Sequence, residues 1–447
     1  MRLALLVLLA LRGLISPSSA VVHATLVSSE PAADSHLAAT PARIRLVYSE
    51  PVEGELARVT LAPGAGAPIV LRAAADPRDV HAVIAPVDSL VPGRYRVEWR
   101  VVSADGHPVD GTFLFAVGDT TLGAQPAPPR PPPAEPVTEA EPEPDVWGPS
   151  VAGAPLIPAL IRGTALGTLM AAAGMLLFLA TADPNAAQSA DRRIRALTTG
   201  LTFAAAVLLA GHAVAWLINT SPEHTFDTEW AGSALSTTVG KIELWRTGLA
   251  ILALWAWWLA RRPRLALVFA IAAICVSGAS GHSAAMQPAW AIPAKTIHLL
   301  ASAVWLGGLL WLVVRPAGDS APLFARDADR VSSRALIAVV AVAFTGVVQT
   351  RLFLPSWGDL VTSAYGLFAL AKTAGLLALA GFGAYNRQRL MPRIAANAAA
   401  GGAALRASVT REIFVMALVI LLGGLLAYVP PPGEGEEGSM TTHQSTS

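Results

Sequence analysis

The stretch SADGHPVDGTF at residues 103–113 contains two side chains that can bind one metal ion together. Asp105 and His107 are two residues apart, so on a β-strand both side chains leave the same face, and a carboxylate oxygen and an imidazole nitrogen can reach one ion. Aspartate and glycine beside proline also describe a plain turn. The pattern by itself therefore leaves metal binding and simple turn formation both open.

A second group of candidate ligands lies in apolar sequence further along the chain. His212, His282 and His298 fall at similar depth in runs long enough to cross a bilayer, and polar groups at membrane depth usually line an interior or a pathway. Cys275 precedes His282 by seven residues, which places a thiol and an imidazole on one face of a predicted helix. These residues have three interpretations: they form a route for a metal ion, they make hydrogen bonds between helices, or paired histidines hold a haem.

The composition indicates the class of protein that contains these residues and the partners that it excludes. Of 447 residues, 53% are hydrophobic and only 14% are charged, a balance typical of a membrane protein. A net charge of +1, with no basic cluster in the polar first part of the chain, argues against a nucleic-acid partner. The phosphate-binding signature G-x-x-x-x-G-K-[ST] is absent, which argues against a nucleotide as the direct energy source.

The chain begins with a pattern typical of export. Residues 1–20 contain a charged residue, a short apolar run that an arginine interrupts, and the small residues SPSSA, so we predict a secretory signal peptide rather than a first membrane anchor. Small side chains up to Ala20 favour a mature chain that starts at Val21; cleavage directly before His23 is the alternative. The only cysteine is Cys275, so the exported part contains no disulfide.

Residues 21–118 are predicted to form an all-β sandwich. Alternating segments such as RIRLVYSEPV, ARVTLA, YRVEWRVV and GTFLFAV are separated by turn residues, and alternation with period two buries one face of each strand. Residues 119–150 are rich in proline and acidic residues, which is typical of an extended linker. We therefore expect the β domain to be tethered loosely to the remainder of the chain.

Residues 151–431 are predicted to form an all-α membrane domain of eight transmembrane helices. With the β domain outside, the connections on the inner side and the residues that abut them hold 15 arginines, whereas the outer connections hold almost none. This positive-inside pattern places both chain ends on the periplasmic or extracellular side of the plasma membrane, with residues 432–447 as a disordered external tail. The predicted spans are 154–182, 194–219, 241–260, 264–282, 292–314, 334–355, 364–384 and 411–430.

The β domain closely resembles the CopC family of periplasmic copper-binding proteins. The segments that carry the resemblance are HATLVSSEPAADSHLAATPARIRLVYSEPV and VVSADGHPVDGTFLFAV. It implies a Greek-key sandwich whose amino-terminal histidine, with its amine and imidazole, binds Cu(II) together with the Asp-x-His stretch, so that the implied ligands are His23, Asp105 and His107. A chain that starts at Val21 also binds Cu(II) through His23 at its third position, and the roles of Asp105 and His107 are then open.

The membrane part is similar to the CopD family of copper-resistance membrane proteins. The similar segments are SGHSAA at 280–285, IHLLASAVWLGGLLWL at 297–312 and YGLFALAKTAGLLALAGFGAYNRQRL at 365–390. A CopC-like domain ahead of a CopD-like domain is similar to fusion proteins assigned to copper acquisition. The resemblance implies copper capture outside and passage inward, as Cu(I) or Cu(II), with His212, His282, His298 and Cys275 as the candidate route.

The predicted function is therefore copper transport, most simply import, rather than catalysis. Without a nucleotide site, the copper gradient, the membrane potential or a reduction step would drive transport, and a copper chaperone or reductase is a candidate partner. The alternatives are copper resistance by sequestration or efflux, and a haem-containing membrane oxidoreductase that acts on copper.

Overall fold

The structure is a computed structural model that describes residues 24–64, 67–104, 106, 108–118, 150–151, 154–181, 192–221, 228–280, 290–315, 321–396, 398–429 and 432. The predicted signal peptide and four of the predicted ligands, namely His23, Asp105, His107 and His282, lie outside the described residues. The chain divides into two units. One contains the β domain together with Trp216–Lys241, and the other contains most of the helical part.

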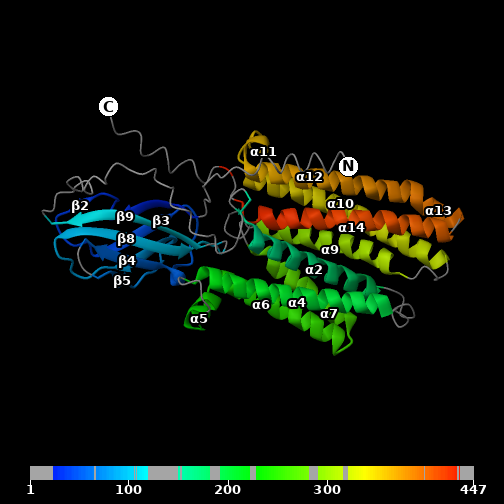
Figure 1. The fold of residues 1–447 in the computed structure, drawn as a ribbon, viewed down its shortest axis with the longest axis horizontal. Helices are drawn as coiled ribbons and strands as arrows, with labels where there is room; N and C mark the ends of the chain where they lie inside the picture. The colour runs from blue at the N-terminus through cyan, green and yellow to red at the C-terminus, as the bar shows by residue number, and fades with distance from the viewer. Residues whose placement is uncertain are drawn as a thin grey trace, which may run out of the picture. The chain divides into compact units, whose positions relative to one another are not determined.

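The β domain is a sandwich of two sheets, drawn in blue to cyan in Figure 1. One sheet has the order β1-β3-β7-β6 and the other β2-β9-β8-β4-β5. Neighbouring strands are antiparallel except β2, which pairs in parallel with β9, so the predicted sandwich is confirmed. The strands are β1 (Leu26–Glu30), β2 (His36–Leu37), β3 (Arg43–Tyr48), β4 (Arg58–Pro63), β5 (Ile69–Leu71), β6 (Ala74–Asp76), β7 (Asp79–Pro86), β8 (Gly93–Val102) and β9 (Pro108–Val117).

Alternating side chains on the strands fill the core between the two sheets. On β8, Val97 and Trp99 are buried, whereas Arg96 and Glu98 between and beside them are exposed. Burial of one such large apolar side chain contributes roughly 1.5–3 kcal/mol. Trp99 also packs edge-on against Tyr48 of the opposite sheet, with ring centroids 5.3 Å apart. The core therefore forms without a disulfide, as the sequence predicts.

Strands β8 and β9 form the hairpin that presents the Asp-x-His stretch. They pair along their whole lengths, from Gly93 opposite Val117 to Val102 opposite Pro108. Gly106, the residue between the two predicted ligands, lies in the connection between these strands rather than in either of them. Two things therefore set the position of Gly106: the pairing register of the hairpin and the side chains that contact the connection between its strands.

The helical part begins after two short paired strands, β10 (Ser150–Val151) and β11 (Ala154–Pro155). Its long helices are labelled in Figure 1. They are α2 (Leu156–Thr181), α4 (Arg192–Thr220), α6 (Thr238–Trp258), α7 (Pro263–Gly278), α9 (Ala291–Val314), α10 (Ala321–Phe353), α12 (Ala364–Tyr385) and α14 (Ala398–Leu426). Shorter helices are α5 (Thr228–Ser236), α11 (Asp359–Thr362) and α13 (Met391–Ala396), and a π-helical turn covers Asn386–Leu390.

Six helices among the described residues are long and apolar enough to cross a membrane, so the predicted number of eight is wrong. The third predicted span corresponds to α6, whose first half carries Lys241, Glu243 and Arg246. The fourth corresponds to α7, which has only 16 residues, fewer than a bilayer span needs. The multi-pass membrane character stands, and the sidedness of the chain stays a prediction. The six helices are α2, α4, α9, α10, α12 and α14.

Small residues allow α2 to approach its neighbours closely. A Cβ atom added at Gly174 of α2 would lie 2.6 Å from the Cα atom of Gly307 on α9. A Cβ atom added at Gly424 of α14 would lie 2.8 Å from the Cα atom of Gly163 on α2. Close backbone approach is the usual way in which membrane helices gain packing energy. These glycines therefore bring α9 and α14 against α2 in the helical unit.

Candidate functional site

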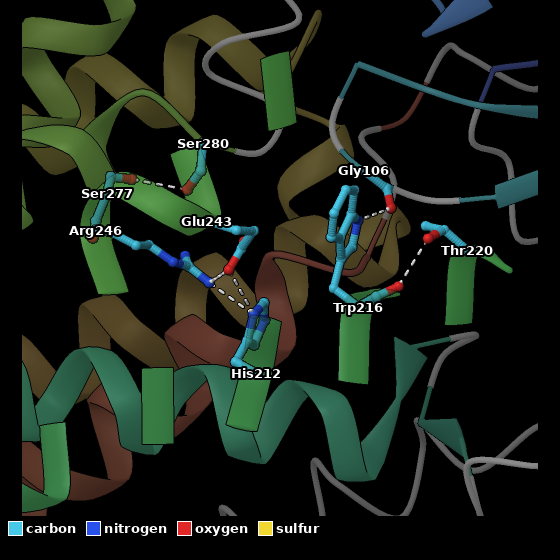
Figure 2. A network of polar contacts seen from close by, with 8 residues as sticks. All are labelled: Gly106, His212, Trp216, Thr220, Glu243, Arg246, Ser277 and Ser280. Carbon is cyan, nitrogen blue, oxygen red and sulfur yellow. Dashed lines mark hydrogen bonds and ion pairs between the residues drawn. The ribbon is translucent and has the colours of Figure 1, made fainter. Parts of the chain in front are cut away.

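The connection between β8 and β9 is held at Gly106. Gly106 has a φ of 96°, a conformation that favours glycine. Its N–H donates to the Ser103 carbonyl at 2.8 Å, and its carbonyl accepts a hydrogen bond from Trp216 Nε1 at 3.0 Å (Figure 2). A Cβ atom here would lie 3.1 Å from Val239 Cγ1. Glycine is thus required both for the backbone conformation and for the close approach of the neighbouring side chains.

His212 takes part in a buried ionic network on α4 and α6 (Figure 2). Its Nδ1 atom lies 2.7 Å from Arg246 Nη2 and 3.3 Å from Glu243 Oε2. Arg246 also donates to the same Glu243 oxygen. His212 is 7% exposed, Glu243 3% and Arg246 1%. These three polar groups therefore make their hydrogen bonds with one another rather than with water.

The contact with Arg246 determines the chemistry open to His212. A guanidinium can only donate hydrogen bonds, so Nδ1 of a neutral His212 accepts and its proton sits on Nε2. A metal ion binds an imidazole nitrogen through its free lone pair. His212 would therefore have to give up its Nε2 proton before that atom could bind copper. The interhelical hydrogen bond that sequence analysis allows for this histidine is present.

His298 on α9 is arranged in the opposite way. Its Nδ1 atom lies 2.9 Å from Thr345 Oγ1, and the Thr345 hydroxyl donates to the Ala341 carbonyl at 2.6 Å. Since the hydroxyl proton is used, Oγ1 accepts the Nδ1 proton of His298. The lone pair of a neutral His298 is then on Nε2, the arrangement that a hydrogen-bonded partner imposes on metal-binding histidines. His298 offers a ligand atom that His212 does not.

The other predicted membrane ligands are not brought together in the described part of the chain. Cys275 lies on α7 with its side chain exposed, and His282 lies outside the described residues. Among the described residues, no group of three or more histidine, cysteine, aspartate or glutamate side chains could hold a metal ion. The geometry of the full predicted ligand set therefore stays a prediction.

Sequence analysis missed two residues that shape these sites. Arg246 follows Glu243 by three residues, a spacing at which opposite charges meet on one helix face, so the pattern could have revealed this pair. Trp216 contacts a residue 110 positions earlier in the chain. No local pattern signals a contact across such a separation.

Comparison with known families covers both parts of the chain. The CopC domain family matches residues 26–118. The family described as "Copper resistance protein D-like, N-terminal domain" matches residues 154–292, and that described as "Copper resistance protein D" matches residues 325–426. The matched segments agree with the β domain and with the helical part of the structure.

Two sequence relatives agree with these matches. The chain is similar to the copper transport protein CutJ of Bacillus subtilis (strain 168), with 24% identity over 388 residues, which are 80% of this chain and 66% of that protein. It is also similar to copper resistance protein C of Escherichia coli, with 40% identity over 109 residues, which cover 22% of this chain and 84% of that protein. The crystal structure of PcoC from Escherichia coli aligns with 22% of this chain and 99% of its own, at 36% identity and a TM-score of 0.20.

The chain spans just under two thirds of the length of CutJ. The β domain, by contrast, covers most of copper resistance protein C at 40% identity. Its matched residues also coincide with the sandwich that the structure shows. The chain therefore belongs to the CopC family, and it joins that copper-binding domain to a CopD-type membrane domain in one polypeptide.

Proposed function

We propose that this protein captures copper outside the plasma membrane and passes it through the membrane into the cell. The observation that supports the proposal is the joining, in one chain, of a CopC domain and a membrane domain of the CopD type. A capture domain fused to a membrane domain raises the effective concentration of its cargo at the outer face. This arrangement suits import better than storage, because storage needs no membrane passage.

The capture step uses Cu(II) in the proposed scheme. His23 supplies an imidazole, and a free amino terminus at or just before it supplies a second nitrogen. Asp105 and His107 complete the set when the mature chain starts at His23. Nitrogen and oxygen donors in a tetragonal arrangement are what Cu(II) prefers. The β domain has no methionine between Met1 and Met170, so it offers no thioether ligand for Cu(I).

Substitutions at these ligands distinguish the two coordination schemes. His23→Ala is expected to abolish tight Cu(II) binding with either start of the mature chain. If intact mass places the start at His23, Asp105→Ala should weaken Cu(II) binding at least about tenfold, which is about 1.4 kcal/mol; if it places the start at Val21, Asp105→Ala should change little. Cu(II) titration of the purified protein measures both, with His81→Ala as a histidine control. Unchanged affinity in His23→Ala would contradict the proposed site.

Passage through the membrane domain uses the candidate ligands His212, His282, His298 and Cys275. The structure supports His298 most directly, because Thr345 holds its Nδ1 proton and leaves Nε2 for a metal ion. His212 contributes less in this scheme, since Arg246 engages its Nδ1 atom. The exposed thiol of Cys275 would take part only if the copper carried is Cu(I).

Copper content of cells with and without the protein tests this function. If the protein imports copper, cells that make it should contain more copper than cells without it when copper is limiting. If it exports copper, cells that make it should contain less copper than cells without it when copper is in excess. Sequestration without transport predicts that the membrane domain alone leaves cellular copper unchanged. A haem absorption spectrum in the purified protein would instead favour the oxidoreductase alternative.

A further inference from the structure

Glu412 of α14 is a carboxyl group buried inside the helical unit, where it is 1% exposed. Its Oε1 atom accepts a hydrogen bond from Trp305 Nε1 of α9 at 3.1 Å, and its Oε2 atom accepts one from Asn386 Nδ2 at 3.0 Å. Both donors are neutral, and within the described part of the chain no lysine, arginine or histidine forms an ion pair with Glu412. A carboxylate buried in this way without a cation is costly.

The arginines closest to this pair in the sequence do not supply the missing charge. Arg411 precedes Glu412 and is exposed. Arg406, earlier on α14, lies over the ring of Phe324, with its Cζ atom 4.7 Å from the ring centroid. The arginines that follow Asn386 are also exposed; they are Arg387, Arg389 and Arg393.

Charged groups on the other helices that pack against α14 have contacts of their own or lie far along it. Lys372 Nζ lies beside Gly423, and Arg162 lies over the ring of Tyr428, so both are at least eleven residues, or roughly 16 Å, beyond Glu412. The remaining contacts are Asp327 with Arg315, Arg334 with Thr181, Lys295 with the Ser280 carbonyl and His298 with Thr345, while Arg326, Asp329, Arg330 and Arg351 of α10 are exposed.

A second carboxylate bound by a tryptophan shows the contrast. Trp311 Nε1, also on α9, donates to Asp327 Oδ2 at 3.2 Å, and Arg315 Nε lies 3.0 Å from the same oxygen. At Glu412 the amide of Asn386 takes the place of the guanidinium. An amide is uncharged, so it cannot balance a carboxylate as arginine does. Glu412 can lose its negative charge only by binding a proton or another cation.

Asn386 is suited to a carboxyl group that gains and loses a proton. It is 7% exposed, and its Oδ1 atom is buried without a hydrogen-bond partner among the described residues. Its amide carries both a donor and an acceptor, so it can donate to an ionised Glu412 or, turned over, accept from a protonated one. Trp305 can only donate and engages Oε1, which leaves Oε2 for the proton. Asn386 also begins a π-helical turn, a feature frequent at functional sites.

We propose that Glu412 is a proton-binding site of the membrane domain, which carries a proton on Oε2 when no copper is bound and releases it when copper binds at His298. The second step rests on the proposed function, since it places copper at His298. His298 and Trp305 are seven residues apart on α9, so they lie on the same helix face with a rise of about 10 Å between them.

This separation links the proton to the copper ion. A cation about 10 Å from a carboxylate in a protein favours its ionised form by a factor on the order of ten. By linkage, a proton on Glu412 weakens copper binding at His298 by the same factor. Under the predicted sidedness, Asn386 and Glu412 border the inner connection at residues 385–410. A proton that enters from the inner side therefore promotes release of copper from His298.

Infrared difference spectroscopy of the full-length protein tests the proton site through the C=O stretching band of a carboxylic acid. Near neutral pH, the wild-type protein should show such a band that Glu412→Gln lacks, because glutamine keeps the size of the side chain and has no carboxyl group. Asp327→Asn is the matched control and should keep the band, since Arg315 pairs with that carboxylate. Glu412→Asp should keep a carboxylic-acid band. Identical spectra of wild type and Glu412→Gln in this region would overturn the proton site.

Copper addition tests the linkage. Cu(I) under anaerobic conditions and Cu(II) are added separately while the pH at which the band disappears is measured. At least one of the two ions should lower this pH by about one unit, which corresponds to a tenfold effect, because a cation favours the carboxylate. His298→Ala should show no such change. An unchanged pH in the wild-type protein, or an equal change in His298→Ala, would overturn the linkage.

Copper uptake by cells is recorded separately. Absence of uptake by the wild-type protein would refute the proposed import. The band that Glu412→Gln removes is measured without copper, so it would still decide whether Glu412 binds a proton.

Discussion

Cells that make the His282→Ala, His298→Ala double variant are expected to accumulate no more copper than cells that lack the protein. Copper released from the β domain must exchange its ligands, and imidazole nitrogens accept either oxidation state. His298 is prepared for this exchange, because Thr345 engages its Nδ1 atom at 2.9 Å and leaves Nε2 with a lone pair. Cellular copper content at matched membrane levels of each variant is the measurement.

Three controls make the copper result specific. The double variant should still insert into the membrane, and its exported domain should still bind Cu(II). His212→Ala should have a weaker effect on uptake, because Arg246 already engages Nδ1 of that histidine. Cys275→Ala should reduce uptake only if Cu(I) is carried. Full uptake by the double variant would leave His282 and His298 as packing residues.

Arg246→Ala is expected to destabilise the membrane domain by about 3–5 kcal/mol, the usual effect of removing one partner from a buried ion pair. Arg246 and Glu243 are 1% and 3% exposed, so the variant leaves a carboxylate buried beside His212 without its cation. The fraction of folded protein that survives heating in detergent, followed by size-exclusion chromatography, measures the loss.

The double variant Glu243→Gln, Arg246→Met serves as the rescue. It removes both charges and keeps similar side-chain volumes, so it should recover most of the lost stability. Arg264→Ala removes an exposed arginine near the start of α7 and should be close to neutral. If Arg246→Ala were as stable as Arg264→Ala, the network would not contribute to the stability of the fold.

The number of spans shows where a prediction from apolar runs fails. The apolar runs that were predicted as the third and fourth spans do form helices in the structure, namely α6 and α7. The mean hydropathy of a long run stays high even when it includes the charges of Lys241, Glu243 and Arg246. Each of these charges is nevertheless costly in a bilayer. The structure shows that Glu243 and Arg246 pair with one another and with His212, which explains how such a helix accommodates them.

The sequence by itself determined what depends on neighbouring residues. Alternation with period two sets the strands of the sandwich, long apolar runs set the membrane helices, and the family segments identify the CopC and CopD parts. These properties are local, because a strand or an apolar helix requires only a consistent pattern along a short stretch. They do not depend on contacts with distant parts of the chain.

Only the tertiary structure decided which atoms of the candidate residues are available. Trp216 contacts Gly106 across 110 residues, and Arg246 contacts His212 across 34. Whether an imidazole presents a proton or a lone pair depends on the partner that the fold places at its other nitrogen, which is Arg246 for His212 and Thr345 for His298. Such partners come together through packing of distant segments, and no pattern of neighbouring residues encodes that packing.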